Sequence, residues 1–178
     1  MNAALPPQAT AATTPPRETA PMMSGADYRE SLRRLKPVVY VDGRLVDSVA
    51  DDPSLAPGVN ALAVTYDMPL DPALAPLMLA PGEDGRLVNR MLALDRSGGD
   101  LLNKLEAVRL LCQQTGCAQR YLVHDAMGGL AQAVATIDDA TGSTEHRARF
   151  NDYLAHVQRE DLSVGIAMTD AKGERSRR

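Results

Sequence analysis

The last stretch of the chain most constrains its fold, because it contains a strand with no sheet to join. Residues Ser163–Met168 are small or apolar, which is typical of a short buried strand, and Thr169–Arg175 read as a polar turn after it. A single strand leaves a row of backbone donors and acceptors open, so it must pair with another strand. We therefore expect an incomplete unit, whose final segment pairs with polypeptide outside these 178 residues.

The composition fits one domain with an aliphatic core. Of the residues 44% are hydrophobic, but the chain has no Trp, one Phe and five Tyr. So few aromatic rings argue against stacking on nucleic-acid bases, and a net charge of −4 argues against a surface that follows phosphates. The arginines at the end, Arg175, Arg177 and Arg178, are more typical of a solvated tail than of a binding patch. No nucleic-acid partner is expected.

The N-terminal residues indicate neither secretion nor membrane insertion. Residues 1–21 are rich in Ala, Thr and Pro and contain no apolar run of signal-peptide length. They should be disordered, because they bury too little surface to offset the entropy of ordering. No later stretch reaches the ~20 apolar residues that a membrane span needs. The expected location is the cytoplasm, with Cys112 and Cys117 both reduced.

A capped helix and a hairpin are expected at the start of the ordered part. Ser24 can cap a helix that passes through Tyr28, Leu32 and Leu35, with Asp27 completing a capping box and Pro37 ending it. The pair Asp42-Gly43 between two β-rich runs predicts a type I′ hairpin over residues 38–46.

Shorter elements are expected between this hairpin and the long helices. Asp52-Pro53 reads as a cap and a first-turn proline before a helix that Pro69 interrupts. A small helix is expected within residues 72–79, followed by turns at Pro81-Gly82 and Asp84-Gly85. Residues 87–94 fit either a strand or an extended connection.

Three long amphipathic helices are predicted in the second half, and together they would form a bundle face. The first starts at Gly98-Gly99-Asp100 and ends at Gly116, the second ends near Gly142, and Ser143 or Thr144 caps the third. Their apolar sets are, in order, Leu101, Leu105, Val108, Leu111 and Cys112; Leu122, Ala126, Met127, Leu130, Val134 and Ile137; and Phe150, Tyr153, Leu154 and Val157. The chain is therefore predicted to be mainly α over residues 22–161, leading into the first strand of a β domain at 162–178.

The densest group of reactive side chains is Cys117–Asp125, at the start of the second long helix. Cys117 and Tyr121 are four residues apart, so they would share a helical face. A cysteine at a helix N-terminus can be a metal ligand or a nucleophile, although Cys112 and Cys117 are more often small buried hydrophobes. His124 and Asp125 would form an acid–base pair only if they faced each other, and adjacent helical residues do not.

Other polar residues in this region offer less chemistry. His146 and His156 are expected at the surface, and no Cys/His spacing gives the four ligands of a complete metal site. Gly128-Gly129 is expected to permit close helix packing.

The succession of short motifs resembles the 4-hydroxyphenylacetate 3-hydroxylase and 4-hydroxybutyryl-CoA dehydratase family. The segments that carry the resemblance run in order from Met22 onward: 24–32, 39–44, Tyr66-Asp67, Asn89-Arg90, Gln119-Arg120, 156–158, 167–170 and 173–175. It implies the N-terminal helical domain of an acyl-CoA dehydrogenase-like fold. The remaining β domain and C-terminal helical bundle would build much of the flavin site. The implied partners are further copies in a homotetramer or a complementing second-half chain.

The resemblance implies FAD, used in one of two ways. In the hydroxylases, reduced flavin from a separate flavin reductase reacts with oxygen to give a hydroperoxide that hydroxylates a phenol. In the dehydratases, flavin and an iron–sulfur cluster remove water from a hydroxyacyl-CoA. The implied flavin contacts are Gln119, Ile166, Ala167, Met168, Thr169, Lys172, Gly173, Glu174 and Arg175. Backbone groups there can hydrogen-bond the edge of the flavin ring, and Lys172 and Arg175 add positive charge. The same residues also suit an ordinary polar turn.

The chain departs from both patterns of the family. The dehydratase pattern Cys-x-x-x-Cys has Tyr121 in place of its second cysteine, and a phenolate is a poor ligand for an iron–sulfur cluster. Only Cys117 remains as a metal ligand, so no normal cluster is expected. The hydroxylase pattern has an Arg-x-x-x-Tyr pair near this helix and a His where Ile166 stands, and neither is matched in place. Arg120, Tyr121 and His124 are the nearest candidate catalytic residues.

We therefore expect the N-terminal portion of an FADH2-dependent monooxygenase-type oxidoreductase that acts on a phenolic substrate and is inactive alone. The missing thiolate favours oxygen chemistry, whereas the motif Ala-Met-Thr-Asp with Lys-Gly-Glu-Arg is nearer to the dehydratases. The alternatives are a 4-hydroxybutyryl-CoA dehydratase-like flavoenzyme and an inert helical interaction module that assembles with other chains.

Overall fold

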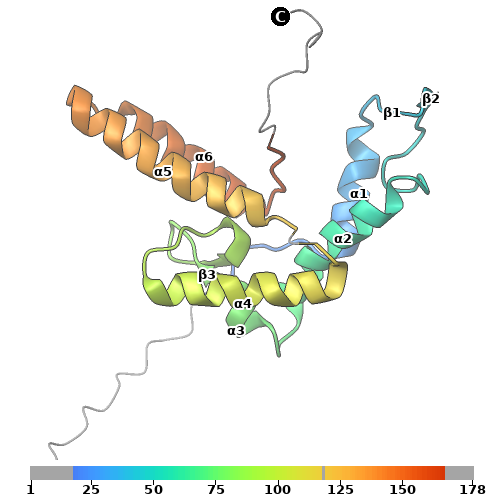
Figure 1. The fold of residues 1–178 in the computed structure, drawn as a ribbon, viewed down its shortest axis with the longest axis horizontal. Helices are drawn as coiled ribbons and strands as arrows, with labels where there is room; N and C mark the ends of the chain where they lie inside the picture. The colour runs from blue at the N-terminus through green and yellow to red at the C-terminus, as the bar shows by residue number, and fades with distance from the viewer. Residues whose placement is uncertain (1–17, 118, 167–178) are drawn as a thin grey trace, which may run out of the picture.

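Helices dominate the architecture, as predicted. The computed structural model describes residues 18–117 and 119–166, which form six α-helices and two small two-stranded sheets. Two pairs of helices, α1 with α2 and α5 with α6, lie above α4 in the view of Figure 1, and the short α3 lies beside α4. The helix bounds are α1 Gly25–Leu35, α2 Ala56–Asp67, α3 Ala75–Met78, α4 Gly98–Thr115, α5 Tyr121–Thr141 and α6 Glu145–Arg159. None of these helices is long and apolar enough to cross a bilayer.

The capped first helix and the hairpin form as the sequence predicts. The Ser24 hydroxyl accepts from the Asp27 amide at 3.1 Å, and the Asp27 carboxylate accepts from the Ser24 amide at 2.9 Å. This capping box satisfies two amides that the helix itself leaves open. Strands β1 (Tyr40–Val41) and β2 (Arg44–Leu45) are joined by residues Asp42 and Gly43, whose φ angles are +50° and +75°. Positive φ at both turn residues is the type I′ geometry.

The predicted cap residue of α2, Asp52, lies one turn before the start of the helix. The helix begins at Ala56, and Leu55 precedes it without a side-chain cap. The Asp52 carboxylate instead accepts from the Ser54 amide at 2.9 Å and from the Arg44 guanidinium at 2.7 Å, so it closes the turn before the helix and ties it to the hairpin. After α2 a short 3₁₀ turn, η1 (Met68–Leu70), contains Pro69, and α3 falls inside its predicted range.

A second small sheet orders residues that the composition predicts to be disordered. Strand β3 (Leu79–Pro81) pairs antiparallel with β4 (Leu87–Asn89) around the predicted turn. The Leu87 amide donates to the Glu18 carbonyl and the Ala20 amide donates to the Leu87 carbonyl, both at 2.9 Å. Ala20 is buried with Ala80, Val88 and Ala93. The prediction of disorder is therefore wrong for residues 18–20, because these contacts offset the entropy of ordering them.

The ambiguous segment after this sheet turns out to combine two structures. Strand β4 ends at Asn89, and a 3₁₀ turn, η2 (Arg90–Leu92), follows it at once. The Asn89 side-chain oxygen accepts from the Met91 amide at 3.1 Å, which starts that turn.

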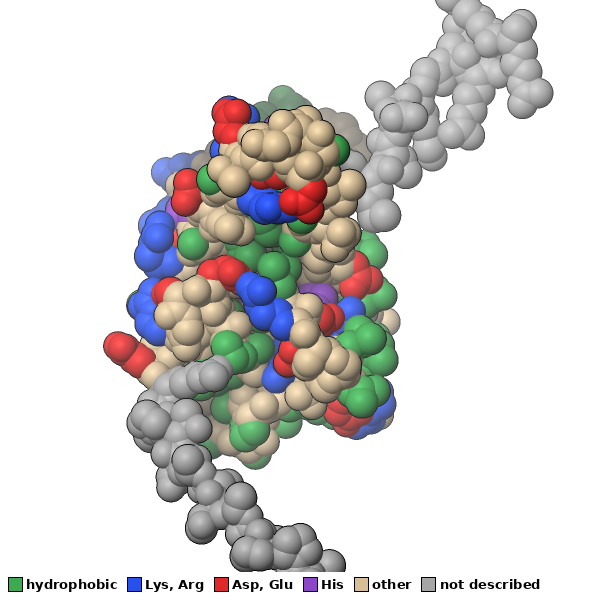
Figure 2. Space-filling view, turned by 90° about the vertical axis from the view of Figure 1, so that its left-hand side faces the viewer, with side chains coloured by type: hydrophobic (Ala, Val, Ile, Leu, Met, Phe, Trp, Pro, Cys, Tyr) green, Lys and Arg blue, Asp and Glu red, His purple; other side chains and the backbone are tan. Residues whose placement is uncertain are grey.

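The long helices end where the sequence predicts, but they bury only part of the predicted apolar faces. Gly116 ends α4 with φ +70°, and its amide donates to the Cys112 carbonyl at 2.9 Å. On α4 the buried side chains are Lys104, Ala107 and Leu111, whereas Leu101, Leu105 and Cys112 are exposed. On α5 the exposed members of the predicted set are Leu122, Ala126, Leu130 and Ile137, and on α6 Tyr153 is exposed. Figure 2 shows apolar side chains at the surface between charges of both signs.

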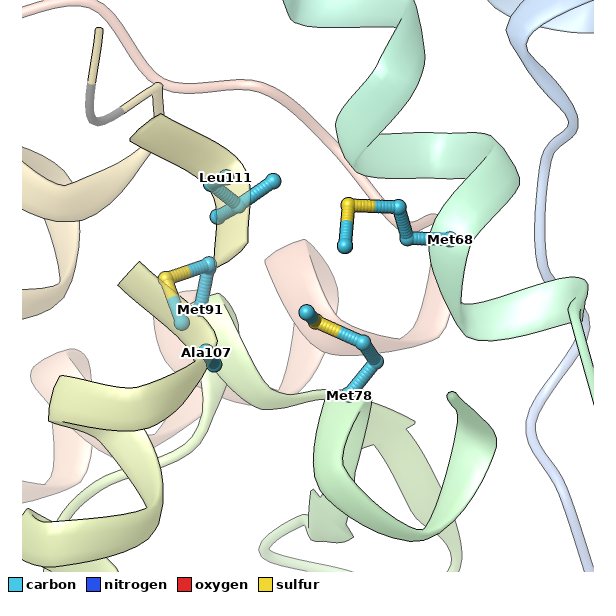
Figure 3. Packing of buried hydrophobic residues seen from close by; sticks show 5 residues of the cluster. All are labelled: Met68, Met78, Met91, Ala107 and Leu111. Atoms are coloured by element: carbon cyan, nitrogen blue, oxygen red, sulfur yellow. The ribbon is translucent and has the colours of Figure 1, made fainter. Parts of the chain in front are cut away.

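Small separate cores replace the predicted bundle face. One core joins Val123 and Met127 of α5 to Phe150 and Leu154 of α6. Another joins α4 to η1, α3 and η2, and in Figure 3 three methionines lie around Ala107 and Leu111: Met68, Met78 and Met91. Methionine is flexible enough to fill the irregular space between elements of different orientation. The three long helices do not share one core, so the prediction of a common bundle face is wrong.

The segment after α6 does not form the predicted strand over the residues that the structure describes. Residues 163–166 have no regular structure and pair with neither of the two sheets among the described residues. Residues 167–178, which complete the predicted strand and turn, lie outside the described residues. At Gly128 and Gly129 an added Cβ atom meets no atom of the described residues within 4 Å, so the predicted close helix packing is not found among them.

Candidate functional site

The turn between α4 and α5 places the candidate residues differently from a continuous helix. Helix α5 begins at Tyr121, and Arg120 before it is left-handed, with φ +61°. Cys117 lies in the turn, where its carbonyl accepts from the Thr115 hydroxyl at 2.6 Å. Cys117 and Tyr121 therefore do not share a helical face. Both Cys112 and Cys117 are exposed, so they are not the small buried hydrophobes that the sequence favours.

Arg120 forms a buried ion pair with Asp161, across 41 residues of sequence. Its Nη2 donates to the Asp161 Oδ1 at 3.1 Å and to the Leu162 carbonyl at 3.0 Å. The Asp161 Oδ2 accepts from the Met23 amide at 3.2 Å. Burial raises the pKa of Asp161 although Arg120 acts in the opposite direction. The pair joins the start of α5 to the segments before α1 and after α6.

Two stacked tyrosines extend this cluster. The Arg120 guanidinium lies over the Tyr66 ring, 4.6 Å from its centroid, and the Tyr66 and Tyr28 rings stack with centroids 4.9 Å apart. The Tyr66 hydroxyl contacts the Ser163 hydroxyl at 2.5 Å. Burial raises the pKa of both phenols, which keeps them neutral at physiological pH.

A surface groove of about 610 Å³ lies over these two rings. Its apolar part comes mainly from α1 and the tyrosines, and its polar rim carries charges of both signs. The lining residues are Met23, Tyr28, Ser31, Leu32, Arg34, Leu35, Tyr66, His156, Glu160, Leu162 and Ser163.

His124 pairs with a residue that the sequence does not point to. Its Nε2 lies 3.0 Å from the Asp95 Oδ2, whereas the neighbouring Asp125 accepts from Lys104 at 3.0 Å. The acid–base pair of His124 with Asp125 is therefore absent, as the helical geometry argued. The His124 side chain is 4% exposed, and its Nδ1 has no partner among the described residues.

Tyr121 lies beside the same carboxylate. A hydrogen bond and the charge of Asp125 raise the pKa of Tyr121, against the smaller effect of the Lys104 ammonium. Burial acts to raise the pKa of Asp125, but bonds from Tyr121 and Lys104 lower it overall. Lys104 thus contacts Asp125 and Asp95, which lie beside the candidate catalytic residues Tyr121 and His124. The third candidate, Arg120, belongs to the separate cluster with Asp161.

Two of the implied flavin contacts fall on described residues. Gln119 is half-buried in the turn before α5, and Ile166 is 39% exposed. The Arg120 bond to the Leu162 carbonyl brings the turn next to the segment that leads to Ile166. The other implied contacts, Ala167, Met168, Thr169, Lys172, Gly173, Glu174 and Arg175, lie outside the described residues.

The donor set near Cys117 does not fit an iron–sulfur cluster. Tyr121 stands where a second thiolate would, and its phenol is engaged with Asp125. The part of the chain that the structure describes holds no group of three or more His, Cys, Asp or Glu side chains arranged for a metal ion. Such clusters are held mainly by Cys thiolates.

The sequence pattern does not reveal the partners of the candidate residues. Lys104, Asp95 and Asp161 each make a contact across 20 residues or more. One signal was present, since Lys104, Ala107 and Leu111 share an i, i+3, i+7 spacing that marks a buried face.

The comparisons with known proteins agree on a family. The profile described as 4-hydroxyphenylacetate 3-hydroxylase N terminal matches residues 24–178. A 4-hydroxybutyryl-CoA dehydratase/vinylacetyl-CoA-Delta-isomerase from Clostridium aminobutyricum is 37% identical over 156 residues, which cover 86% of this chain and 32% of that protein. The oxygenase component of 4-hydroxyphenylacetate 3-monooxygenase from Thermus thermophilus is 24% identical over 155 residues, covering 86% of this chain and 31% of that protein.

Solved structures give the same order of similarity. An oxygen-tolerant archaeal 4-hydroxybutyryl-CoA dehydratase from N. maritimus matches with a TM-score of 0.80 at 40% identity, over 88% of this chain and 31% of that one. An oxygenase component of 4-hydroxyphenylacetate 3-monooxygenase, in complex with FAD and 4-hydroxyphenylacetate, matches with a TM-score of 0.68 at 23% identity, over 88% and 32%. The second match shows a shared fold. The chain spans about a third of the length of these relatives.

Proposed function

Because the chain belongs to the 4-hydroxyphenylacetate 3-hydroxylase N-terminal family, we propose that it is the N-terminal portion of a flavoenzyme of the 4-hydroxybutyryl-CoA dehydratase type. One observation carries this choice: two dehydratases share 37% and 40% identity with the chain, whereas the oxygenase components share 24% and 23%. The order of the two enzymatic alternatives is thus the reverse of the sequence-based expectation. The substrate class is an acyl-CoA thioester rather than a free phenol.

The chain's own contribution would be one wall of the flavin and substrate site. A bound FAD would supply the electron-accepting ring, with Gln119 and the segment from Ile166 onward at its edge. Tyr121 keeps its proton at neutral pH, as an ordinary phenol does, and Asp125 raises the pKa of the phenol further. It would therefore serve as a neutral hydrogen-bonding group toward a substrate oxygen and not as a proton donor. The buried side-chain nitrogens without a hydrogen-bond partner among the described residues are the Nδ1 of His124 and the Nε and Nη1 of Arg120.

The cluster chemistry of the dehydratases is not part of the proposal. Cys117 with Tyr121 does not supply the thiolates of a cluster, so the proposal is confined to the double-bond shift of an acyl-CoA, which loses one proton, gains another and releases no water. FAD would supply the electron-accepting ring when bound, and Tyr121 and His124 would orient the substrate beside it.

The test uses the chain together with the remaining two thirds of the enzyme, either joined or co-expressed. Purified protein is assayed anaerobically with 4-hydroxybutyryl-CoA and with vinylacetyl-CoA, and aerobically with FADH2 and 4-hydroxyphenylacetate. We expect turnover of at least one acyl-CoA, bound FAD in the visible spectrum, and iron below one equivalent. Oxygen-dependent hydroxylation of the phenol without acyl-CoA turnover would overturn the proposal.

A monooxygenase remains the second candidate, favoured by one feature. Tyr121 in place of a thiolate removes a ligand that dehydratase chemistry uses in the family and leaves a phenol in its place. In that case a flavin reductase would be a partner, and activity would depend on it. An assembly partner is proposed for either enzyme, as further copies of the chain or as a second-half polypeptide; absence of FAD from every such assembly would support the inert helical module.

A further inference from the structure

Lys104 is an unusual residue for the buried side of α4. Its side chain is 8% exposed, although lysine is among the residues most rarely buried without a partner. Its ammonium lies 3.0 Å from the Asp125 Oδ1 and 3.4 Å from the Asp95 Oδ2. It also lies over the Tyr121 ring, 5.8 Å from the centroid. A single cation therefore contacts two carboxylates from different parts of the chain.

Each of these carboxylates holds one candidate residue of the site. Asp95 lies 3.0 Å from the His124 Nε2, and the Asp125 carboxylate raises the pKa of the Tyr121 phenol, whose ring centroid lies 5.8 Å from the same ammonium. Tyr121 and His124 occupy the first turn of α5, whereas Lys104 comes from the middle of α4. The ammonium thus lies at the centre of a polar chain that runs from Tyr121 through Asp125, Lys104 and Asp95 to His124.

We propose that Lys104 is a positioning residue of this site, which fixes Tyr121 and His124 through Asp125 and Asp95. Its chemical setting rests on the proposed function, but the contacts themselves do not. An ammonium is required here because the carboxylates of Asp95 and Asp125 both lie within 3.4 Å of the Lys104 Nζ. Without a cation between them, their like charges would repel each other. Its three donors can serve both carboxylates at once.

The electrostatic consequence can be followed at Tyr121. Asp125 disfavours the phenolate and Lys104 favours it, and these are the charged groups that act on the ring. Removal of the ammonium leaves Asp125 without its cation, so the phenol becomes harder to deprotonate. Removal of the Asp125 charge has the opposite effect. On the other side of the ammonium, Asp95 faces His124 and also acts on the buried Arg90.

The experiment measures the titration of Tyr121 in the full 178-residue chain by ultraviolet difference spectroscopy. Subtracting the titration of the same variant carrying Tyr121→Phe isolates this phenol from the other four tyrosines. The variants are Lys104→Met, Lys104→Arg and, as a matched control on the same helix, Arg109→Met, which removes a cation from an exposed pair with Glu106. Titration is confined to the pH range in which circular dichroism shows intact helices.

Lys104→Met should raise the midpoint of Tyr121 above the wild-type value, Lys104→Arg should return it toward wild type, and Arg109→Met should leave it unchanged. A folded Lys104→Met chain that titrates like wild type would overturn the proposal. If Lys104→Met does not fold, Asp125→Asn provides the second measurement. A lowered midpoint in that variant supports the arrangement, and an unchanged midpoint contradicts it.

An assay of the completed enzyme separates this inference from the proposed function. Lys104→Met should lower kcat more than it raises KM, with partial rescue by Lys104→Arg, because the substrate itself does not contact the ammonium. The expected midpoint shifts without any acyl-CoA turnover in the wild type would refute the proposed function and leave the Lys104 contacts standing. Turnover that is insensitive to Lys104→Met would refute the positioning role alone.

Discussion

At the scale of single residues, two non-glycine residues with a left-handed backbone conformation form an ion pair with each other. Arg120 and Asp161 have φ angles of +61° and +46°, a conformation that costs an L-residue roughly 1–2 kcal/mol. Their ion pair is almost fully buried, with side chains 2% and 3% exposed. The contacts of the pair with Leu162 and Met23 keep both residues in place. The site at the start of α5 therefore depends on a residue 41 positions away.

Removal of the Arg120 guanidinium should destabilise the whole chain. Arg120→Met leaves the Asp161 carboxylate buried without its cation, which costs about 3–5 kcal/mol for such pairs. Arg120→Lys keeps the charge but loses the planar guanidinium that lies over the Tyr66 ring, so an intermediate loss is expected. Urea denaturation followed by circular dichroism measures both variants.

The double variant Arg120→Met with Asp161→Leu provides the control. Because it removes both charges, it should be less destabilised than the sum of the two single variants. Additive losses would mean that the two side chains are not energetically coupled.

Asp138 should make the stability of the α5–α6 pair depend on pH in the acid range. Its carboxylate accepts from the His146 and Arg147 amides at 3.2 and 2.9 Å, so it caps α6 from the end of α5. Although burial acts to raise it, these bonds and His146 lower the pKa of Asp138 below the ordinary 3.8. A lowered pKa gives stability that is present above pH 3.8 and is lost as pH falls through the native value.

Asp138→Asn therefore should be less stable than the wild type near neutral pH, and the difference should shrink below about pH 4. Urea midpoints at a series of pH values from neutral to acid measure this difference. A difference that stays constant across the series would show that the carboxylate charge is not what caps α6.

At the scale of elements, the sequence predicts where helices end better than which side they bury. Capping residues and glycines act within a few positions, so the bounds of α1 and α4 follow from local chemistry. The buried side depends on what packs against a helix. On α4 the buried Lys104 and Ala107 lie next to the exposed Leu101 and Leu105, a distinction that periodicity alone does not make.

Replacing two glycines by alanine should change the stability of the chain in opposite directions. Gly116 ends α4 at φ +70° with open space around its Cα, so Gly116→Ala costs backbone strain alone, about 1–2 kcal/mol. Gly128 lies within α5 and also faces open space, so Gly128→Ala should gain up to ~1 kcal/mol from helix propensity. Thermal unfolding of both variants checks the pair. Destabilisation by Gly128→Ala would indicate that something covers this part of α5.

The sequence predicts a candidate site at the start of α5, and the catalytic role of its residues stays a prediction. Arg120 and His124 are buried there and make hydrogen bonds that the sequence does not indicate. Their partners Asp161 and Asp95 lie 41 and 29 residues away, where local spacing carries no signal. All of the implied flavin contacts, Gln119 and Ile166 included, stay predictions.

At the scale of the whole molecule, the described part of the chain has small cores and a partly apolar surface. Four clusters of buried side chains replace a single core. The exposed large residues include Leu101, Leu102 and Leu105 of α4 and Leu122 of α5. We propose that these leucines form an apolar surface that contacts other polypeptide.

Replacing exposed leucines on α4 should change association and not folding. In the double variant Leu102→Lys and Leu105→Lys, stability should stay within about 0.5 kcal/mol of wild type for each exposed site. Binding of a hydrophobic dye and sedimentation measure the effect, and both dye binding and self-association should fall. Arg109→Lys on the same helix is the control. Equal dye binding by the double variant and the wild type would contradict this role of the α4 leucines.

The bridge between Thr19 and Leu87 sets a limit on how far the chain can be shortened. Proteolysis or a shortened expression product that starts at Met22 would strip the sheet of its outer segment, since Leu87 bonds both Glu18 and Ala20. The freed edge of β4 would then be available to any extended peptide nearby. A minimal version of this chain that resists aggregation must therefore retain Glu18.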